Sequence, residues 1–225
     1  MMEYRMEYRY PDDPIRLPPS SAMFANIDKD GSWRAGPKRN GWRRLAYKEN
    51  GIWTLHAKRD TSPEAKRPLS ADLVKRLAAF PIPDGTALDL EWMGTRDVAY
   101  TGGQPQWLEA IDIHYWNYQW QGDLAFDERM KSLADLIALC AAADGSNIKT
   151  LVLVPTWKDD IYKQFCRLAM EWKTSSEALA KGTVLQTEGA ISEGVVLKKG
   201  TGKLRGDRTH TVDNPFWAKV KYREG

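Results

Sequence analysis

Six consecutive residues, Lys38-Arg39-Asn40-Gly41-Trp42-Arg43, join a candidate nucleophile to a tight turn and a second cation. A lysine amine can attack an electrophile only when it is neutral, and its reference pKa of about 10.4 opposes that state at neutral pH. Burial and neighbouring cations lower the pKa of a lysine. Lys38 is therefore a candidate nucleophile only if the fold brings other cations beside it.

The strand-like segment 216–222 could supply those cations. Side chains alternate along a strand, which puts Trp217, Lys219 and Lys221 on one face and apolar residues on the other. The two ammonium groups could bind a phosphate and disfavour protonation of Lys38. Taken alone, this pattern is also typical of an amphipathic edge strand that faces water.

Two carboxylates have comparably fixed positions. Alternation over residues 88–92 turns Asp89 and Glu91 to one side of the strand. A carboxylate there could accept a hydrogen bond from a ribose hydroxyl or hold a divalent cation. Glu193, just before the apolar run 195–197, is the second. Phosphoryl transfer needs a nucleophile, charge neutralisation and in-line positioning. One lysine nucleophile, two carboxylates for Mg²⁺ and two phosphate-binding lysines would meet that need.

The elements that would position these residues are predicted from periodicity. Short alternating blocks up to residue 55 and the apolar run 151–154 indicate strands. Ser70 has the position of a helix N-cap, and Pro81 would end that helix. Helical periodicity also extends over 126–140 and 161–172. Because strands and helices are mixed without strict βαβ alternation, we predict an α+β fold.

Length and composition limit the type of protein. With 225 residues and 42% hydrophobic content the chain can bury a substantial core, and we predict one domain over residues 1–225. The net charge of +3 is small for a nucleic-acid partner, so attraction would come from basic clusters near Lys38 and in 198–208. The ten Trp residues could stack on bases beside those clusters, although most are expected in the core.

Cysteine usage and hydropathy indicate an intracellular protein. Cys140 and Cys166 are the two cysteines, and their spacing suggests neither a disulfide framework nor a metal site. The sequence has no apolar run long enough to span a bilayer and no secretory leader at its charged start. We therefore expect a cytoplasmic protein with no membrane partner.

In their chain order, these segments resemble the motifs of the covalent nucleotidyltransferase superfamily, which contains ATP-dependent DNA ligases, RNA ligases and mRNA capping enzymes. The resemblance runs from about Lys38 to Lys221. It implies a ligase-type nucleotidyltransferase (adenylation) domain of mixed, mainly antiparallel sheets flanked by helices. Four residues follow Lys221, so we expect no OB-fold.

The resemblance also implies a role for individual residues. In this family the lysine of a Lys-x-x-Gly-x-Arg motif attacks the α-phosphate of ATP and forms lysyl-AMP, which assigns catalysis to Lys38. Glu91 and Glu193 would hold the metal, Mg²⁺ or alternatively Mn²⁺. Ile111 stands where the family has an aromatic residue stacked on adenine, with Tyr115 or Trp116 as weak substitutes. The implied nucleotide-binding residues are Arg43, Arg59, Glu91, Ile111, Glu193, Lys219 and Lys221.

The function predicted from these motifs is an ATP-dependent polynucleotide ligase that seals 5′-phosphate and 3′-hydroxyl ends. Its partner would be nicked duplex DNA or an RNA/DNA hybrid, bound by a monomer. Asn40 stands where DNA ligases commonly have an aspartate, and this difference slightly favours a resemblance to the RNA ligases. The alternatives are a capping-type guanylyltransferase and a nucleic-acid-binding relative without catalysis.

Overall fold

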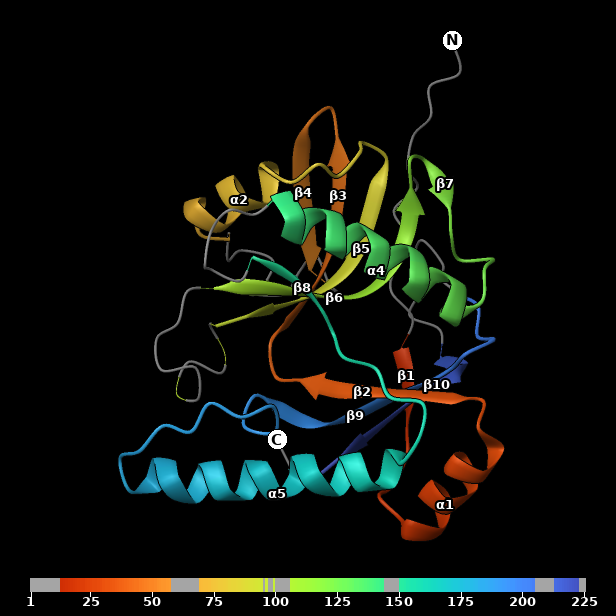
Figure 1. Ribbon diagram of the computed structural model, residues 1–225, viewed down its shortest axis with the longest axis vertical. Helices are drawn as coiled ribbons and strands as arrows, with labels where there is room; N and C mark the ends of the chain where they lie inside the picture. Colours follow the sequence, from red (N-terminus) through yellow and green to blue (C-terminus); the bar gives the residue numbers. More distant parts are fainter. Residues whose placement is uncertain are drawn as a thin grey trace.

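Two β-sheets lie one above the other in the computed structural model, with helices on their outer sides (Figure 1). The structure describes residues 13–57, 69–94, 96, 99, 106–143, 150–204 and 213–222. The four-stranded sheet has the order β1 (Asp13–Arg16), β10 (Asp213–Lys221), β9 (Ser192–Lys199) and β2 (Trp33–Arg39). The six-stranded sheet has the order β4 (Ile52–Ala57), β3 (Trp42–Glu49), β5 (Thr86–Met93), β6 (Trp107–Trp116) and β7 (Gln119–Trp120), with β8 (Leu151–Leu153) beside β6.

Most strand pairs are antiparallel, as the resemblance implied. The parallel pairs are β1 with β10 and β6 with β8. The chain passes from one sheet to the other at the β2–β3 turn, so the two sheets share the segment that contains the Lys-x-x-Gly-x-Arg motif.

Each sheet has its own hydrophobic core. Helices α1 (Ser21–Asp30) and α5 (Ile161–Ala180) pack below the four-stranded sheet, where they bury apolar residues of β9 and β10 (Figure 1). Helices α2 (Ala71–Ala78) and α4 (Phe126–Ala143) cover the other sheet and pack on apolar residues of β5 and β6. Burial of these two apolar faces is the main favourable term in folding. The opposite faces of the sheets turn toward each other.

The predicted helices are present. Ser70 caps α2, where its hydroxyl accepts the Leu73 N–H at 3.3 Å, and the other two cover the predicted ranges and extend beyond them. Helix α1 is an element that the periodicity analysis missed. It has only two buried apolar residues, Phe24 and Ile27, and its ends are defined instead by the Ser20 N-cap and by Gly31 in the left-handed conformation.

No helix among the described residues is long and apolar enough to cross a membrane. The Met-Glu-Tyr-Arg sequence, which occurs at 2–5 and again at 6–9, lies outside the described residues.

Strand β6 contains two register irregularities that change which way its side chains face. The first skips Ile111 opposite Asp89 and Leu90, and the second skips His114 opposite Ala87 and Leu88. Ala110 and Ile113, three residues apart, therefore both enter the core beneath α4. Between them, Ile111 and Asp112 both lie toward the four-stranded sheet.

The second irregularity generates a prediction about acid stability. His114 is 2% exposed, and burial lowers its pKa from the usual 6.5 to about 4, although the charges of Asp89 and Asp112 oppose that shift. The folded state therefore binds this proton less readily than the unfolded chain, and stability is lost as the pH falls from 6.5 toward 4. We expect the loss from this residue to be about 2 kcal/mol at pH 5.

The measurement is urea unfolding at pH 7 and pH 5. His114→Gln should lose less stability between the two pH values than the wild type. His56→Gln, at a half-buried position on β4, is the matched control and should keep the wild-type difference. An unchanged pH difference in His114→Gln would contradict the assignment.

Candidate active site

The cavity between the two sheets collects residues that the sequence analysis singled out. Its volume is about 330 Å³, and its walls come from β2 and β9 on one side and from β3, β5 and β6 on the other. Lys221 lies beside it, next to a residue of the wall. The predicted residues that line it are Lys38, Arg43, Glu91, Ile111, Glu193 and Lys219.

Glu193 joins the predicted nucleophile to one of the predicted phosphate-binding lysines. One carboxylate oxygen accepts a hydrogen bond from the Lys38 ammonium, and the other accepts a hydrogen bond from Lys221 Nζ, 3.0 Å away. Burial would raise the pKa of the Glu193 carboxyl, but the charge of Lys38 and the hydrogen bonds from both lysines outweigh it and lower the pKa. Three adjacent strands thus place two cations on one ionised carboxylate.

The alternation predicted for the last strand explains this arrangement. On β10, Ala218 and Val220 point into the core with α5, while Trp217 and Lys219 face the cavity. On β9, Val195 and Leu197 point into the same core, and Val196 lines the cavity. Burial of Val195 and Leu197 on one face of β9 therefore makes the opposite face of this strand point into the cavity.

Gly41 brings the six-stranded sheet to the predicted nucleophile. Its N–H donates to Glu91 Oε1 at 3.0 Å, and a side chain here would place Cβ 2.5 Å from the Trp92 carbonyl oxygen and 2.8 Å from Glu91 Cγ. The motif thus has glycine where the β2–β3 turn passes directly against β5.

Burial raises the pKa of Glu91 to about 7, although the positive charges of Lys38 and Arg43 act in the opposite direction. A carboxyl group near its midpoint at neutral pH can either accept or donate a hydrogen bond. Glu91 therefore offers this wall of the cavity a group that can act as a hydrogen-bond acceptor or donor.

Arg43 and Asp89 form a bidentate ion pair in the same wall. The Arg43 Nε and Nη2 atoms lie 2.8 and 2.6 Å from the two carboxylate oxygens of Asp89, which is fully buried. The guanidinium group also lies over the Trp217 ring, 5.8 Å from its centroid. Asp89 therefore orients Arg43 from behind while the arginine remains part of the cavity lining.

The aromatic residue expected against a purine base is absent at its predicted position. Ile111 lines the cavity, whereas Tyr115 is buried in a separate cluster and Trp116 packs on the core beneath α4. The weak substitutes proposed from the sequence are therefore wrong. Ile111 reaches the cavity because the first register irregularity of β6 turns it there.

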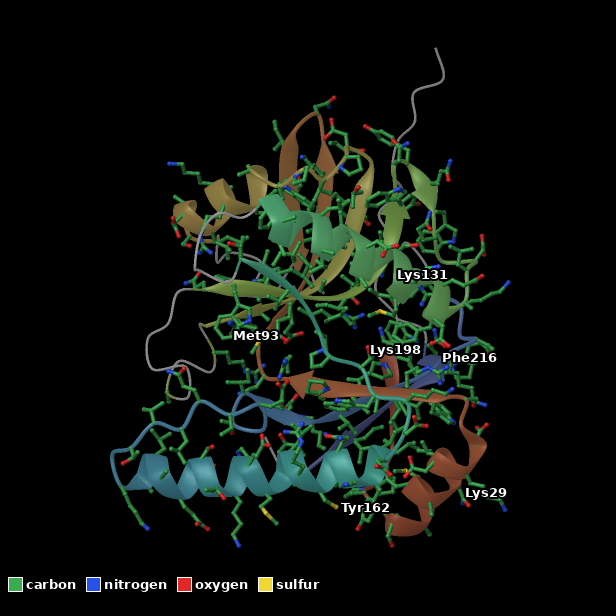
Figure 2. All side chains as sticks on the ribbon, viewed as in Figure 1. Lys29, Met93, Lys131, Tyr162, Lys198 and Phe216 are labelled. Atoms are coloured by element: carbon green, nitrogen blue, oxygen red, sulfur yellow. The ribbon has the colours of Figure 1, made fainter. Side chains whose placement is uncertain are left out.

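Lys198 was assigned from the sequence to an exposed basic cluster, and this assignment is wrong. It is 5% exposed and lies between the sheets (Figure 2), where Nζ is 3.1 Å from Asp112 and 4.0 Å from the centroid of the Trp217 ring. Arg129 of α4 binds both oxygens of Asp112 from the other side, at 2.8 and 3.1 Å. Burial would raise the pKa of Asp112, but the two cations hold it below its usual range.

A second ion pair crosses between the sheets. Arg39 of β2 binds Glu109 of β6, and both side chains are buried. Glu188, in the segment before β9, lies 2.5 Å from the same arginine. Arg39 therefore also does not belong to an exposed phosphate-binding surface. Sequence reasoning missed Glu109 and Asp112 because the cations that pair with them across the two sheets, Arg39 and Lys198, lie 70 and 86 residues away.

Arg59 and a metal site are the two remaining features that the sequence predicted. Arg59 lies outside the described residues. Within the part of the chain that the structure describes, no group of three or more His, Cys, Asp and Glu side chains could hold a metal ion. Glu91 and Glu193 remain the carboxylates on the cavity wall.

Comparison with known proteins places the fold. No protein-family model matches the sequence, and no curated protein matches it significantly. Among solved structures, mycobacterial DNA ligase D in complex with ATP and MES is similar with a TM-score of 0.59 at 15% identity, over 94% of this chain and 60% of that one. The ligase domain of M. tuberculosis LigD gives 0.60 at 16% identity, over 94% and 59% of the two chains.

The ATP-dependent DNA ligase of bacteriophage T7, in complex with ATP, is also similar, with a TM-score of 0.52 at 12% identity over 94% of this chain and 68% of that one. This chain therefore spans about 60% of the length of the two mycobacterial structures. The likeness confirms the predicted α+β fold of ligase adenylyltransferase domains. At these identities it shows the fold alone.

The contact between the β2–β3 turn and β5 generates a prediction. Gly41→Ala should lower the free energy of unfolding by about 2 kcal/mol or more, because its methyl group meets backbone that cannot move aside cheaply. Asn40→Ala in the same turn is the matched control and should cost less, since the Asn40 contact to Ile191 is made by the backbone. Equal stability of the two variants in urea unfolding would contradict the close approach.

Proposed function

We propose that this protein is an ATP-dependent polynucleotide ligase, which seals 5′-phosphate and 3′-hydroxyl ends of nicked DNA or RNA through a lysyl-AMP intermediate. The observation that carries the proposal is the position of Lys38. It lies on the wall of the cavity between the sheets, bonded to Glu193, with Lys219 on the same wall and Lys221 on the other oxygen of Glu193.

In the first step, Lys38 Nζ attacks the α-phosphorus of ATP, and the bond to the β-phosphate oxygen breaks as pyrophosphate leaves. The amine must be neutral, so one proton of the ammonium passes to solvent, and the amine exchanges its contact with Glu193 for the phosphate. A second proton passes to solvent as the nitrogen–phosphorus bond forms. Lys219 and Lys221 then neutralise charge on the α-phosphate oxygens. Glu193 keeps the attacking amine aligned until the phosphate arrives.

The second and third steps reuse the same cations. A 5′-phosphate oxygen attacks the phosphorus of lysyl-AMP, the Lys38 amine leaves, and AMP is joined to the nucleic-acid end. The 3′-hydroxyl then attacks the 5′-phosphate, and AMP departs with the bonding electron pair. Each step transfers a phosphoryl group, so the requirement for positioned positive charge stays constant.

The donor set fits a nucleotide-bound Mg²⁺, with Mn²⁺ as the alternative. Mg²⁺ keeps several waters and takes one or two protein carboxylates together with substrate phosphates, so no three-residue cluster is required. Glu193 and Glu91 are the carboxylates on the cavity wall that would hold it. When bound, the ion would neutralise phosphate charge during transfer.

Two other functions are compatible with the fold. A capping-type guanylyltransferase would form the same lysyl bond with GMP, and a non-catalytic relative would bind nucleic acid without any nucleotide bond. Two observations distinguish the three functions: whether the protein forms a covalent bond to a nucleotide, and whether that nucleotide is AMP or GMP. A monomeric cytoplasmic ligase with one domain over residues 1–225, acting on a nicked duplex, remains the proposal.

The first test follows label from ATP onto the protein. With Mg²⁺ and α-labelled ATP, the wild type should carry covalent AMP through a denaturing gel, and Lys38→Ala should carry none. Lys48→Ala is the matched control, because Lys48 lies on β3 and binds the Ile82 carbonyl outside the cavity. Label in Lys38→Ala at the wild-type level would refute the nucleophile assignment, and preference for GTP would favour the capping function.

A second arm of the same test measures sealing. Lys38→Ala should still seal a nick whose 5′ end is already adenylylated, because that substrate needs only the third step. Nicked duplexes with DNA or RNA on each side of the break would identify the strand preference. If the wild type carries covalent AMP but seals none of these substrates, the nucleotidyltransferase activity is supported and the ligase activity is refuted.

The aliphatic cavity wall generates a separate prediction. Ile111→Phe should tighten ATP binding by about 3- to 10-fold, because an aromatic pair adds about 0.5–1.5 kcal/mol beyond its buried area. Isothermal titration measures the affinity, and Ile113→Leu, a swap in the core behind the same strand, is the control. Weaker binding by Ile111→Phe would show that the base does not lie on this residue.

A further inference from the structure

Side chains cross the cavity face of the four-stranded sheet in rows set by strand register. One row contains Gly36, Val196 and Lys219 on neighbouring strands, and it continues onto the edge strand at Arg16. Its first two members are small, so this row forms the floor of a groove. The row on one side of it consists of Arg34, Lys198 and Trp217.

The groove is closed at one end and open at the other. At the Gly36 end, a Cβ atom would lie 3.0 Å from the Pro155 carbonyl oxygen, and Val154 and Thr156 line the cavity there. At the other end lie Lys219 and the exposed Arg16. Ile111 and Val196 offer apolar contact to the face of a base near the closed end, and the phosphates of a nucleotide bound in this way would extend toward the cations.

Strand β1 fixes the direction of Arg16. Leu17, the next residue, packs into the core formed with α1 and α5, and its N–H donates to the Lys219 carbonyl at 3.0 Å. Ala218 and Val220, the neighbours of Lys219 on β10, point into the same core. Arg16 pairs with Lys219 and directly precedes Leu17, so alternation places it with Lys219 on the face turned away from that core.

Several cations in and beside the cavity already have a carboxylate partner. Lys38 and Lys221 share Glu193, and Lys198, Arg39 and Arg43 each bind a buried carboxylate. Among the residues that the structure describes, Arg16 forms no ion pair. Within that part of the chain, a phosphate would not have to displace a carboxylate from Arg16.

We infer that Arg16 binds the phosphate joined to the α-phosphate, which deepens and rests on the proposed function. In ATP this group is the β-phosphate, and in an adenylylated nucleic-acid end it is the 5′-phosphate. Both occupy the position next to the AMP moiety. A guanidinium group offers two parallel N–H donors to such a phosphate.

The experiment compares nucleotides that differ only in this phosphate. Isothermal titration with AMP, ADP and ATP is performed on the wild type, Arg16→Ala and Arg16→Lys. Arg16→Ala should weaken ADP and ATP binding about 10-fold or more and change AMP binding by less than about 2-fold, as expected for loss of a charge-assisted hydrogen bond. Arg16→Lys should recover part of the loss.

Arg167→Ala is the matched control, because Arg167 lies on α5, on the far side of the four-stranded sheet (Figure 1). Sealing of a pre-adenylylated nick by Arg16→Ala separates the two phosphates. Slower sealing with normal ADP affinity assigns Arg16 to the 5′-phosphate, and weaker ADP binding with normal sealing assigns it to the β-phosphate.

Two outcomes have different consequences. If Arg16→Ala matches the wild type for ADP, ATP and sealing, or weakens AMP as much as ADP, the inference about Arg16 is overturned. If the wild type binds none of the three nucleotides, the proposed function fails as well, and with it the premise of the inference.

Discussion

Two buried ion pairs hold the sheets together while the cavity between them stays open. Arg39 with Glu109 and Lys198 with Asp112 each join the four-stranded sheet to β6. Apolar side chains at these positions would bring the sheets into close packing, whereas paired charges keep a defined separation. Removing one partner of such a pair leaves an uncompensated buried charge and costs about 3–5 kcal/mol. Together with the β2–β3 turn, these two contacts join the sheets around the cavity.

Charge pairing continues along the cavity wall itself. Arg43 is oriented by Asp89, and Lys38 and Lys221 are held by Glu193, so cations that face the cavity are fixed before a ligand arrives. Preorganised charge of this kind costs no rearrangement during a phosphoryl transfer. In the proposed mechanism the Lys38 contact is the exception, because an amine that attacks phosphorus must leave its carboxylate. Glu193 would then both position the proposed nucleophile and restrain it.

The sequence predicted those parts of the site that depend on local alternation. The two faces of β10 and the shared side of Asp89 and Glu91 follow from a period of two. The irregularities of β6 break that period, so the cavity position of Ile111 and the burial of Asp112 had no local signal. Lys198 was assigned to the surface for a related reason, since its partner Asp112 is distant in sequence. Helix α1 was missed because it is short and buries only two apolar side chains.

The aliphatic wall at Ile111 has a consequence for how affinity is distributed along a nucleotide. Val196 and Ile111 offer apolar contact to a base but not the additional attraction of an aromatic pair. Trp217 and Phe126 also line the cavity, but Lys198 lies over both rings and covers them. Under the proposed function, nucleotide recognition would therefore rest mainly on the sugar and the phosphates, through the carboxylate of Glu91 and the cations of β2 and β10. A protein built in this way would discriminate nucleotides by the number of their phosphates more strongly than by their bases.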